Sequence, residues 1–250
     1  MGGTTGLGFS AAEAFVFQGA VVVVVGRDPI SCQHAQTNLL GRGISFSGDA
    51  RNPDTAIQAI ALCKKIFGGF DGLYHVAGGS GRQYGDGPLH ELSLDGWNST
   101  LELNLTTLML SNQAAVKAFI DQGVGGTILN MSSVLGYSPS PDHFGTHAYA
   151  AAKSAVFGFV KSAAAYYAKY DIRMNVIAPA LVETPMSQRA SHNEGIMSFI
   201  RTKQPLGNGR IGMPDDLNGA AVYFMSDLSA FTTGQMLAVD GGWSISEGQN

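Results

Sequence analysis

Residues 20–25 hold one alanine followed by five valines, and this run limits the fold more than any other stretch of the chain. A strand that is β-branched and apolar on both faces is typical of a parallel sheet covered by helices on both sides. Further strand-like runs alternate with helix-like segments along the chain. The strand-like runs are 44–47, 72–76, 127–131, 172–177 and 235–239, and the helix-like segments are 6–18, 30–41, 53–67, 94–121, 149–170 and 214–225. This alternation predicts an α/β fold with a doubly wound, mostly parallel sheet, in a single domain over residues 1–250.

Residues 183–212 are the one long stretch without a regular helix or strand pattern. Long ordered loops in compact domains usually cover or line a binding site. We therefore expect a substrate lid or loop at about 183–212.

Composition argues against several kinds of partner. Only 14% of the residues are charged and the net charge is −4, so nothing favours binding to nucleic acid or to a membrane surface. No apolar run reaches the roughly 18 residues that would cross a bilayer, and no signal-peptide pattern opens the sequence. Cys32 and Cys63 lack metal-type spacing and are interpreted as free thiols. These features predict a cytoplasmic protein without a metal site.

The chain begins with a glycine-rich turn formed by Gly2, Gly6 and Gly8, directly before a helix-like run. Glycine lets backbone N–H groups approach a diphosphate, and the N-terminus of the following helix adds a favourable dipole. A flexible N-terminal tail is the alternative interpretation. In nucleotide-binding folds such a turn follows a strand, whereas here only Met1 precedes Gly2.

Ligands of doubly wound sheets bind beyond the carboxyl ends of the strands, so the residues that follow each predicted strand are candidates for a site. They are Gly26, Arg27 and Asp28; Gly48, Asp49 and Ala50; Ala77, Gly78 and Gly79; Ser132 and Ser133; and Pro179.

Tyr149 and Lys153 lie four residues apart on one predicted helix and therefore share a face. A phenol ionises near pH 10, and a nearby ammonium group can lower that pKa by about 1–3 units, which suits proton transfer to or from an alcohol or carbonyl oxygen. Ser133 could hold the same oxygen. The alternatives are a solvated helix face, a capping role for Ser133, and a structural network for Asn104, a polar residue in an apolar helix.

Taken in order, these motifs resemble the short-chain dehydrogenase/reductase family in its common form of about 250 residues, over essentially the whole chain. The resemblance rests on Gly2, Gly6 and Gly8, Asp49, Ala77-Gly78, Asn104, Ser133, Tyr149 with Lys153, Pro179 with Thr184, and the closing Val239-Asp240-Gly241-Gly242. It implies a Rossmann-type subunit that transfers a hydride between a nicotinamide dinucleotide and a carbonyl/alcohol pair.

The resemblance also implies roles for the catalytic residues. Tyr149 would be the general acid/base, and Lys153 would lower its pKa and hold the nicotinamide ribose. Ser133, three residues before Gly136, is preferred to Ser132 for orienting the substrate oxygen. Asn104 would anchor a water of the proton relay.

Cofactor contacts follow in the same way. The diphosphate would lie against Gly2, Thr4, Thr5, Gly6 and Leu7, and the adenine against Asp49 and Ala50. Ala77, Gly78, Tyr149 and Lys153 would also contact the cofactor, and Thr184 would bind the carboxamide next to Pro179 and Val182. His75 departs from the family, which usually has Asn there; it is interpreted as a satisfied strand-end histidine, with a cofactor contact as the alternative.

Cofactor preference can be argued from charge. Members that prefer NAD end the second strand with a carboxylate, but here Gly26 is followed by Arg27. A guanidinium can bind a 2′-phosphate in bidentate fashion, so NADP(H) is expected, with NAD(H) left open because of Asp28.

The expected protein is thus an NADP(H)-dependent oxidoreductase acting on a small carbonyl or alcohol. An NAD-dependent alcohol dehydrogenase and a nucleotide-binding protein without turnover are the alternatives. The long apolar helices at 94–121 and 149–170 suggest a homodimer or homotetramer. The identity of the substrate is not encoded in any motif.

The family also has a buried central strand where this chain has Met1. Without it, the flanking strands would keep unpaired N–H and C=O groups, at about 1–3 kcal/mol each if buried. We therefore expect the first strand to be missing from this sequence and residues to precede Met1; the alternative is that another segment of the chain fills the gap.

Overall fold

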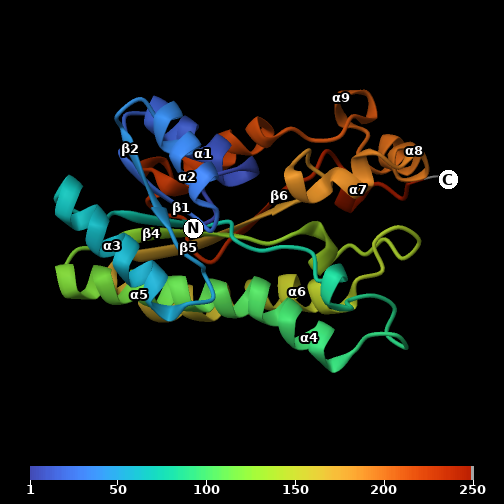
Figure 1. Cartoon of the computed structure of the whole chain (residues 1–250), viewed down its shortest axis with the longest axis horizontal. Helices are drawn as coiled ribbons and strands as arrows, with labels where there is room; N and C mark the ends of the chain where they lie inside the picture. The colour runs from blue at the N-terminus through green and yellow to red at the C-terminus, as the bar shows by residue number, and fades with distance from the viewer. Residues whose placement is uncertain (249–250) are drawn as a thin grey trace.

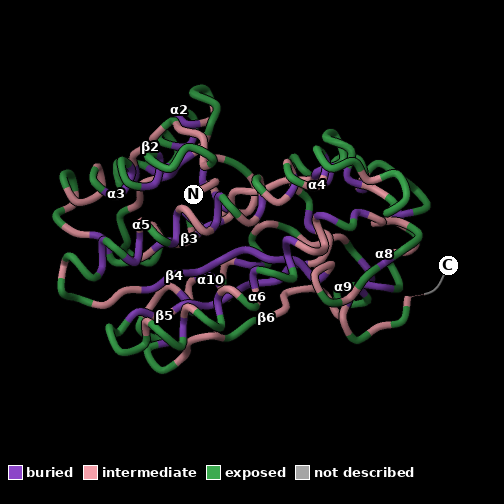
Figure 2. Tube along the Cα trace, turned by 90° about the horizontal axis from the view of Figure 1, so that it is seen from below, coloured by how far each residue is buried: buried purple, intermediate pink, exposed green. Residues whose placement is uncertain are grey.

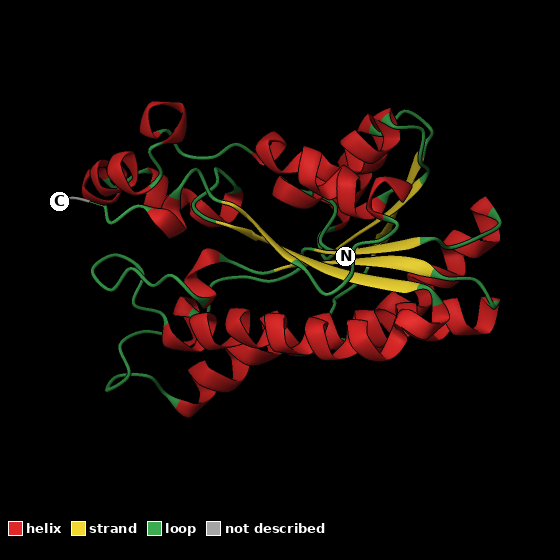
Figure 3. Cartoon of the chain, turned by 180° about the vertical axis from the view of Figure 1, so that it is seen from behind, coloured by secondary structure: helices red, strands yellow, loops and turns green. Residues whose placement is uncertain are grey.

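The computed structural model of the chain describes residues 1–248 and confirms a doubly wound α/β fold (Figures 1 and 3). Its strands, all parallel to their neighbours, are β1 Val22–Gly26, β2 Gly43–Ser47, β3 Gly72–His75, β4 Gly126–Met131, β5 Ile172–Pro179 and β6 Met236–Val239. Its helices are α1 Gly6–Phe17, α2 Pro29–Asn38, α3 Pro53–Phe67, α4 Leu94–Leu101, α5 Thr107–Gln122, α6 His147–Tyr167, α7 Gln188–Ser191, α8 Glu194–Lys203, α9 Leu206–Gly209 and α10 Asn218–Met225.

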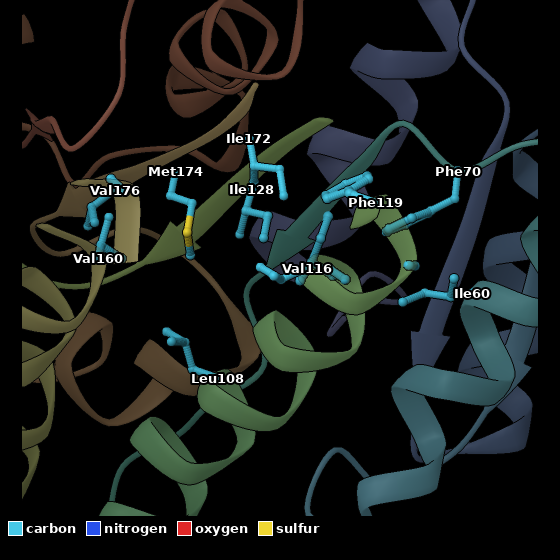
Figure 4. Close-up of a cluster of buried hydrophobic side chains, with 14 of the residues drawn as sticks. Ile60, Phe70, Leu108, Val116, Phe119, Ile128, Val160, Ile172, Met174 and Val176 are labelled. Carbon is cyan, nitrogen blue, oxygen red and sulfur yellow. The ribbon is translucent and has the colours of Figure 1, made fainter. Parts of the chain in front are cut away.

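Helices cover both faces of the strands. On one face, α3, α5 and α6 pack against β3, β4 and β5 around Leu108, Phe119, Ile128 and Met174, as Figure 4 shows. On the other face, α1 and α10 pack against the same strands through side chains that include Ala11, Ile177 and Phe224. Strands β4 and β5 are therefore buried almost throughout, and they form the continuous buried band of Figure 2. This two-sided burial explains their apolar sequences.

The sheet is divided into two parts: β1 pairs with β2, and β3-β4-β5-β6 form a separate four-stranded sheet. Within the described residues no strand lies between β1 and β3. Residues 1–3 bridge only the carboxyl ends of β1 and β3. The amides of Gly2 and Gly3 donate hydrogen bonds to Val25 O at 2.9 and 3.0 Å. On the other side, the amides of Val76 and Ala77 donate to Met1 O at 2.9 and 3.1 Å. The glycine-rich turn is thereby tied to the ends of both flanking strands.

Two segments differ from the sequence-based expectation. The predicted helix at 94–121 is interrupted by a π-helical turn, Glu102–Thr106, between α4 and α5. Residues 183–212 are not irregular throughout, because they contain α7, α8 and α9, which lie together at one end of the molecule (Figure 1). The side chain of Asn193 caps α8 by accepting from the Ile196 amide at 2.9 Å, and Ile200 is fully buried beside Trp243. This tertiary packing stabilises a helix whose sequence is largely polar.

In residues 1–248, no helix is both long enough and apolar enough to cross a membrane.

Candidate active site

The glycine-rich turn presents the N-terminus of α1 at the carboxyl ends of β1 and β3. A side chain at Gly8 would overlap the Gly2 carbonyl, so only glycine allows the helix to pack directly on the turn. Thr5, the N-cap residue of α1, makes no side-chain capping bond, and the first turn of the helix has no acidic residue. The first N–H groups of α1 are therefore available to an anion, as a diphosphate site requires.

A cavity of about 1140 Å³ opens at this edge of the sheet. The predicted cofactor and catalytic residues all line it except Asn104: they are Gly2, Thr4, Thr5, Gly6, Leu7, Arg27, Asp49, Ala50, Ala77, Gly78, Ser133, Tyr149, Lys153, Pro179, Val182 and Thr184. Segments from the whole length of the chain thus meet at one site. Thr184 lies close to the glycine-rich turn, because a Cβ on Gly6 would be 3.5 Å from its methyl group.

Ser133, Tyr149 and Lys153 come together at the end of β4 and the start of α6. The Lys153 ammonium lies 5.5 Å from the centre of the Tyr149 ring and donates a hydrogen bond to Met131 O at 3.1 Å. The neighbouring Ser132 hydroxyl donates to Lys153 O at 2.7 Å and is only 2% exposed. Ser132 thereby donates to the backbone. The Ser133 hydroxyl accepts from Leu135 N at 3.2 Å, so its capping role is present, and it also hydrogen-bonds to the Tyr149 phenol.

The pKa of Tyr149 does not follow the sequence-based expectation. Burial raises it to about 12, and the hydrogen bond from Ser133 offsets this only in part. Burial also lowers the pKa of Lys153 to about 8, since the buried ammonium lacks a carboxylate partner. In the chain by itself the net shift of the Tyr149 pKa is upward, because burial is its largest cause; the lowering of this pKa by Lys153 stays a prediction.

Asn104 lies outside the cavity and is fully buried in the π-helical turn. Its side chain accepts from Gly79 N at 3.1 Å and donates to Gly79 O at 2.9 Å and Thr100 O at 3.0 Å. The two bonds to Gly79 hold the strand-end segment that follows Gly78, and the third joins Asn104 to the preceding helix α4. The structural network considered for Asn104 is thus present, while its role in anchoring a water stays a prediction.

His75 is buried and satisfied on both nitrogens. Its Nε2 lies 3.0 Å from Ala77 O and its Nδ1 lies 2.7 Å from the Ser111 hydroxyl. Burial moves the pKa of His75 well below its usual value, so the ring is neutral. This geometry supports the interpretation as a satisfied strand-end histidine.

The residues expected to decide between NADP(H) and NAD(H) follow strand β1 and line the same cavity. A side chain at Gly26 would overlap the Thr4 hydroxyl, so this position excludes a carboxylate as long as Thr4 stays in place. Arg27 is exposed, and its charge helps to lower the pKa of Asp49. The Asp28 carboxylate caps α2, where it accepts from Ser31 N at 2.9 Å and from the Ser31 hydroxyl at 2.6 Å.

Sequence reasoning missed two acidic contacts near the site. Arg51 forms an ion pair with Asp49 at 2.6 Å, and this pairing is the main cause of the lowered pKa of Asp49. Asp86, 4% exposed, accepts hydrogen bonds from Ala148 N at 3.0 Å and Tyr149 N at 2.9 Å. Asp86 therefore caps the helix that carries Tyr149 from 62 residues away. No local pattern signals such a contact.

Replacing Asp86 by alanine is expected to lower the free energy of unfolding by about 2–4 kcal/mol, because two buried amides lose their acceptors. Asp86→Asn should lose less, since its one side-chain oxygen can still accept. Urea unfolding of both variants measures these losses. Asp142→Ala, on an exposed loop, is the control and should change stability by less than about 0.5 kcal/mol. A loss that small for Asp86→Ala would contradict the capping role.

Other residues of the cavity wall also carried no motif. Near Ser133 and Tyr149 the wall includes Arg82, Tyr84, Phe144, Met186, Arg189 and Trp243. They come from loops and short helices whose positions depend on tertiary packing.

Comparison with known proteins decides the family. Residues 2–244 match the family model described as enoyl-(acyl carrier protein) reductase. The chain belongs to the short-chain dehydrogenase/reductase family. It is 34% identical over 244 residues to a 2,5-dichloro-2,5-cyclohexadiene-1,4-diol dehydrogenase of Sphingobium indicum, covering 97% of this chain and 94% of that protein. It is 31% identical over 247 residues to an NADP-dependent (R)-specific alcohol dehydrogenase of Lentilactobacillus kefiri, again covering 97% and 94%.

A solved structure of a short-chain dehydrogenase/reductase from Mycobacterium ulcerans superposes with a TM-score of 0.90 at 29% identity, covering all of this chain and 90% of the other. As a member of the short-chain dehydrogenase/reductase family, the chain is an oxidoreductase that acts on hydroxyl groups with a nicotinamide dinucleotide. The uncapped N-terminus of α1 and the size of the cavity fit such a cofactor. Within residues 1–248 no cluster of three or more His, Cys, Asp or Glu side chains could hold a metal ion.

Proposed function

We propose that this protein is an NADP(H)-dependent oxidoreductase that transfers a hydride between the nicotinamide and a carbonyl or secondary alcohol, with Tyr149 as general acid/base. The observation that carries the proposal is the placement of Ser133, Tyr149 and Lys153 in the same cavity as the uncapped glycine-rich turn. A nucleotide-binding protein without turnover would have no use for this polar group beside the cofactor.

The bound cofactor supplies or accepts the hydride. With a pKa of about 12, the Tyr149 phenol stays protonated at neutral pH, which is the form that donates a proton to a carbonyl oxygen during reduction. The Ser133 hydroxyl holds the same oxygen. Lys153, which donates to Met131 O, places a positive charge beside the phenol and would hold the nicotinamide ribose. Asn104 fixes the backbone after Gly78, and its anchoring of a relay water belongs to the proposal.

The cofactor would extend from Asp49 and Ala50 at the adenine, past Gly2, Thr4, Thr5, Gly6 and Leu7 at the diphosphate, to Pro179, Val182 and Thr184 at the nicotinamide, with Ala77 and Gly78 along its side. Residues 1–250 would act as one catalytic domain, with 183–212 bordering the substrate. A small carbonyl or alcohol substrate, a cytoplasmic location and a homodimer or homotetramer complete the proposal.

The preference for NADP(H) rests on charge. Arg27 forms no ion pair among the described residues, while Arg51 is occupied by Asp49. The negative charge of Asp28 is partly offset because its oxygens point at the N-terminal amides of α2. A 2′-phosphate beside Arg27 would therefore meet an unpaired guanidinium. An NAD-dependent alcohol dehydrogenase remains the second candidate.

Replacing Arg27 by glutamine is expected to lower kcat/KM for NADPH about 10- to 100-fold, because a charge-assisted bond to the 2′-phosphate is lost. The value for NADH, which lacks that phosphate, should change far less. Arg42→Gln, an exposed position beyond the cavity, is the matched control. A wild-type enzyme that prefers NADH would overturn the assignment of Arg27.

The function itself is tested by a panel of ketones, aldehydes and secondary alcohols, with absorbance of the reduced nicotinamide as the readout. We expect turnover of at least one carbonyl with NADPH. Tight cofactor binding without turnover of any member of a broad panel would favour the non-catalytic alternative.

A further inference from the structure

Two arginines line the cavity on the side of the proposed catalytic residues. Arg82 lies in the short 3₁₀ helix Arg82–Tyr84, which follows β3, and Arg189 lies in α7. The two residues are more than 100 positions apart in the sequence. Partial burial is the largest cause that lowers the pKa of the Arg82 guanidinium, and the positive charge of Arg189 is the second. Two side chains of like charge thus line the same cavity, and the charge of one affects the other.

Neither guanidinium has a carboxylate partner in the described part of the chain. The ion pairs there join Arg51 to Asp49, Arg210 to Asp216, and two exposed pairs elsewhere. The Arg189 side chain donates one long hydrogen bond, 3.4 Å, to His143 O, and no hydrogen bond occupies the Arg82 guanidinium within residues 1–248. Most of the ten N–H donors of the two side chains are therefore free to bind a ligand.

The acidic residue closest to Arg82 does not neutralise the pair. The charge of Asp86 raises the pKa of Arg82, but no hydrogen bond joins the two side chains within residues 1–248. Both carboxylate oxygens of Asp86 accept hydrogen bonds from backbone amides at the start of α6. Of the other charged side chains that line the cavity, Asp28 and Asp49 are bonded to Ser31 and Arg51, and Lys153 adds a further positive charge beside Tyr149. The local charge therefore stays positive, and both guanidinium groups, which are exposed, are accessible to an anion that enters the cavity.

The position of the pair relative to the catalytic group is also defined. The amides that Asp86 binds include that of Tyr149, so the Arg82 loop is attached to the catalytic helix itself. Arg189 reaches His143, in the segment between Ser133 and Tyr149. The cofactor phosphates are expected at the other end of the cavity, around Gly2–Leu7 and Arg27. The arginine pair is therefore attached to segments next to Tyr149 and borders the part of the cavity expected to hold the substrate.

We propose that Arg82 and Arg189 bind an oxyanion group of the substrate, a carboxylate or a phosphate, so that the enzyme prefers acidic carbonyl or alcohol compounds over neutral ones. Planar guanidinium groups match these anions in bidentate geometry, and two of them would fix the distance between the anion and the reacting carbon. This inference rests on the proposed function, because it takes Tyr149 as the place of reaction.

The test compares acidic and neutral probes that share one carbonyl. The first pair is 4-oxopentanoate and its methyl ester, and the second is dihydroxyacetone phosphate and dihydroxyacetone. Calorimetry measures their binding to the full chain with its oxidised cofactor bound, and a parallel assay follows NADPH oxidation. The variants are Arg82→Gln and Arg189→Gln, with Arg201→Gln, exposed on α8 and outside the cavity, as the matched control.

We expect the wild-type protein to bind at least one acid about 10-fold or more tightly than its neutral partner, and each cavity variant to reduce that ratio about 10-fold. Arg201→Gln should keep the ratio. A preference within the first pair of probes identifies the bound group as a carboxylate, and a preference within the second pair identifies it as a phosphate. Equal binding of acid and neutral probe, or a preference that persists in the Arg82→Gln/Arg189→Gln double variant, overturns the inference. If the preference holds but no carbonyl is reduced, the proposed reaction fails while the anion site stands.

Discussion

Replacing Tyr149 by phenylalanine is expected to lower kcat by about 10²- to 10⁴-fold, the usual contribution of a positioned general acid or base. The substitution removes one hydroxyl and keeps the ring, which lies 5.5 Å from the Lys153 ammonium. Among the residues expected to bind the cofactor only the Tyr149 hydroxyl is removed, so the affinity for NADPH should change by less than about 3-fold, or 0.7 kcal/mol. Steady-state kinetics and NADPH fluorescence titration measure the two quantities.

Tyr166→Phe is the matched control, because Tyr166 lies on the same helix, is 59% exposed and is outside the cavity. It should keep wild-type kcat. A Tyr149→Phe variant with normal turnover would show that the proton comes from another group. A fall in NADPH affinity as large as the fall in kcat would show that Tyr149 holds the cofactor and would contradict a purely chemical role.

Much of the fold follows from local signals. The helix predicted for residues 53–67 has the bounds of α3, because Pro53 suits the first helical position, Asn52 caps the helix and Gly68 ends it in the left-handed region. The predicted bounds of the apolar strands agree with the structure to within one or two residues. Their signal is the continuous apolar run that burial on both faces leaves in the sequence. These features depend on neighbours along the chain.

Features that depend on tertiary contacts were not predicted. The π-helical turn at Glu102–Thr106 coincides with the hydrogen bonds of Asn104 to Gly79, 25 residues away. Helix α8 depends on burial of Ile200 beside Trp243. Asp86 and the arginine pair depend on loops that approach one another only in the folded chain. The residues of the expected cofactor and catalytic site could thus be predicted largely from the strand ends. The loop residues that line the rest of the cavity could not.

The ionisation of the site shows the same limit. The spacing of Tyr149 and Lys153 correctly places both side chains on one face, and the pair rule then predicts a lowered pKa for the phenol. In the structure, burial is the largest cause for both groups, so the pKa of Tyr149 rises and that of Lys153 falls. Desolvation depends on what packs around the pair, which spacing does not report.

The buried Lys153 leads to the second large prediction, in which activity and stability change in opposite directions. Lys153→Met should abolish most of the turnover, because it removes the charge beside Tyr149. A fall of the lysine pKa from 10.5 to about 8 corresponds to about 3 kcal/mol of destabilisation at neutral pH. Methionine fills a similar volume without a charge but leaves Met131 O without its donor, at about 1 kcal/mol. The cofactor-free variant should therefore be more stable than wild type by about 2 kcal/mol at pH 7.

The pH dependence separates this cause from better packing. Between pH 8 and pH 10.5 the unfolded wild-type chain binds more protons at Lys153 than the folded chain does, so the Lys153 contribution to stability improves as the pH rises. The advantage of Lys153→Met, measured by urea unfolding, should accordingly shrink from pH 7 to pH 10. Lys161→Met, at an exposed position on the same helix, should show no such trend. An advantage that is equal at both pH values would mean that the gain comes from packing. A variant that is less stable at pH 7 would mean that the bond to Met131 O outweighs the cost of burying the charge.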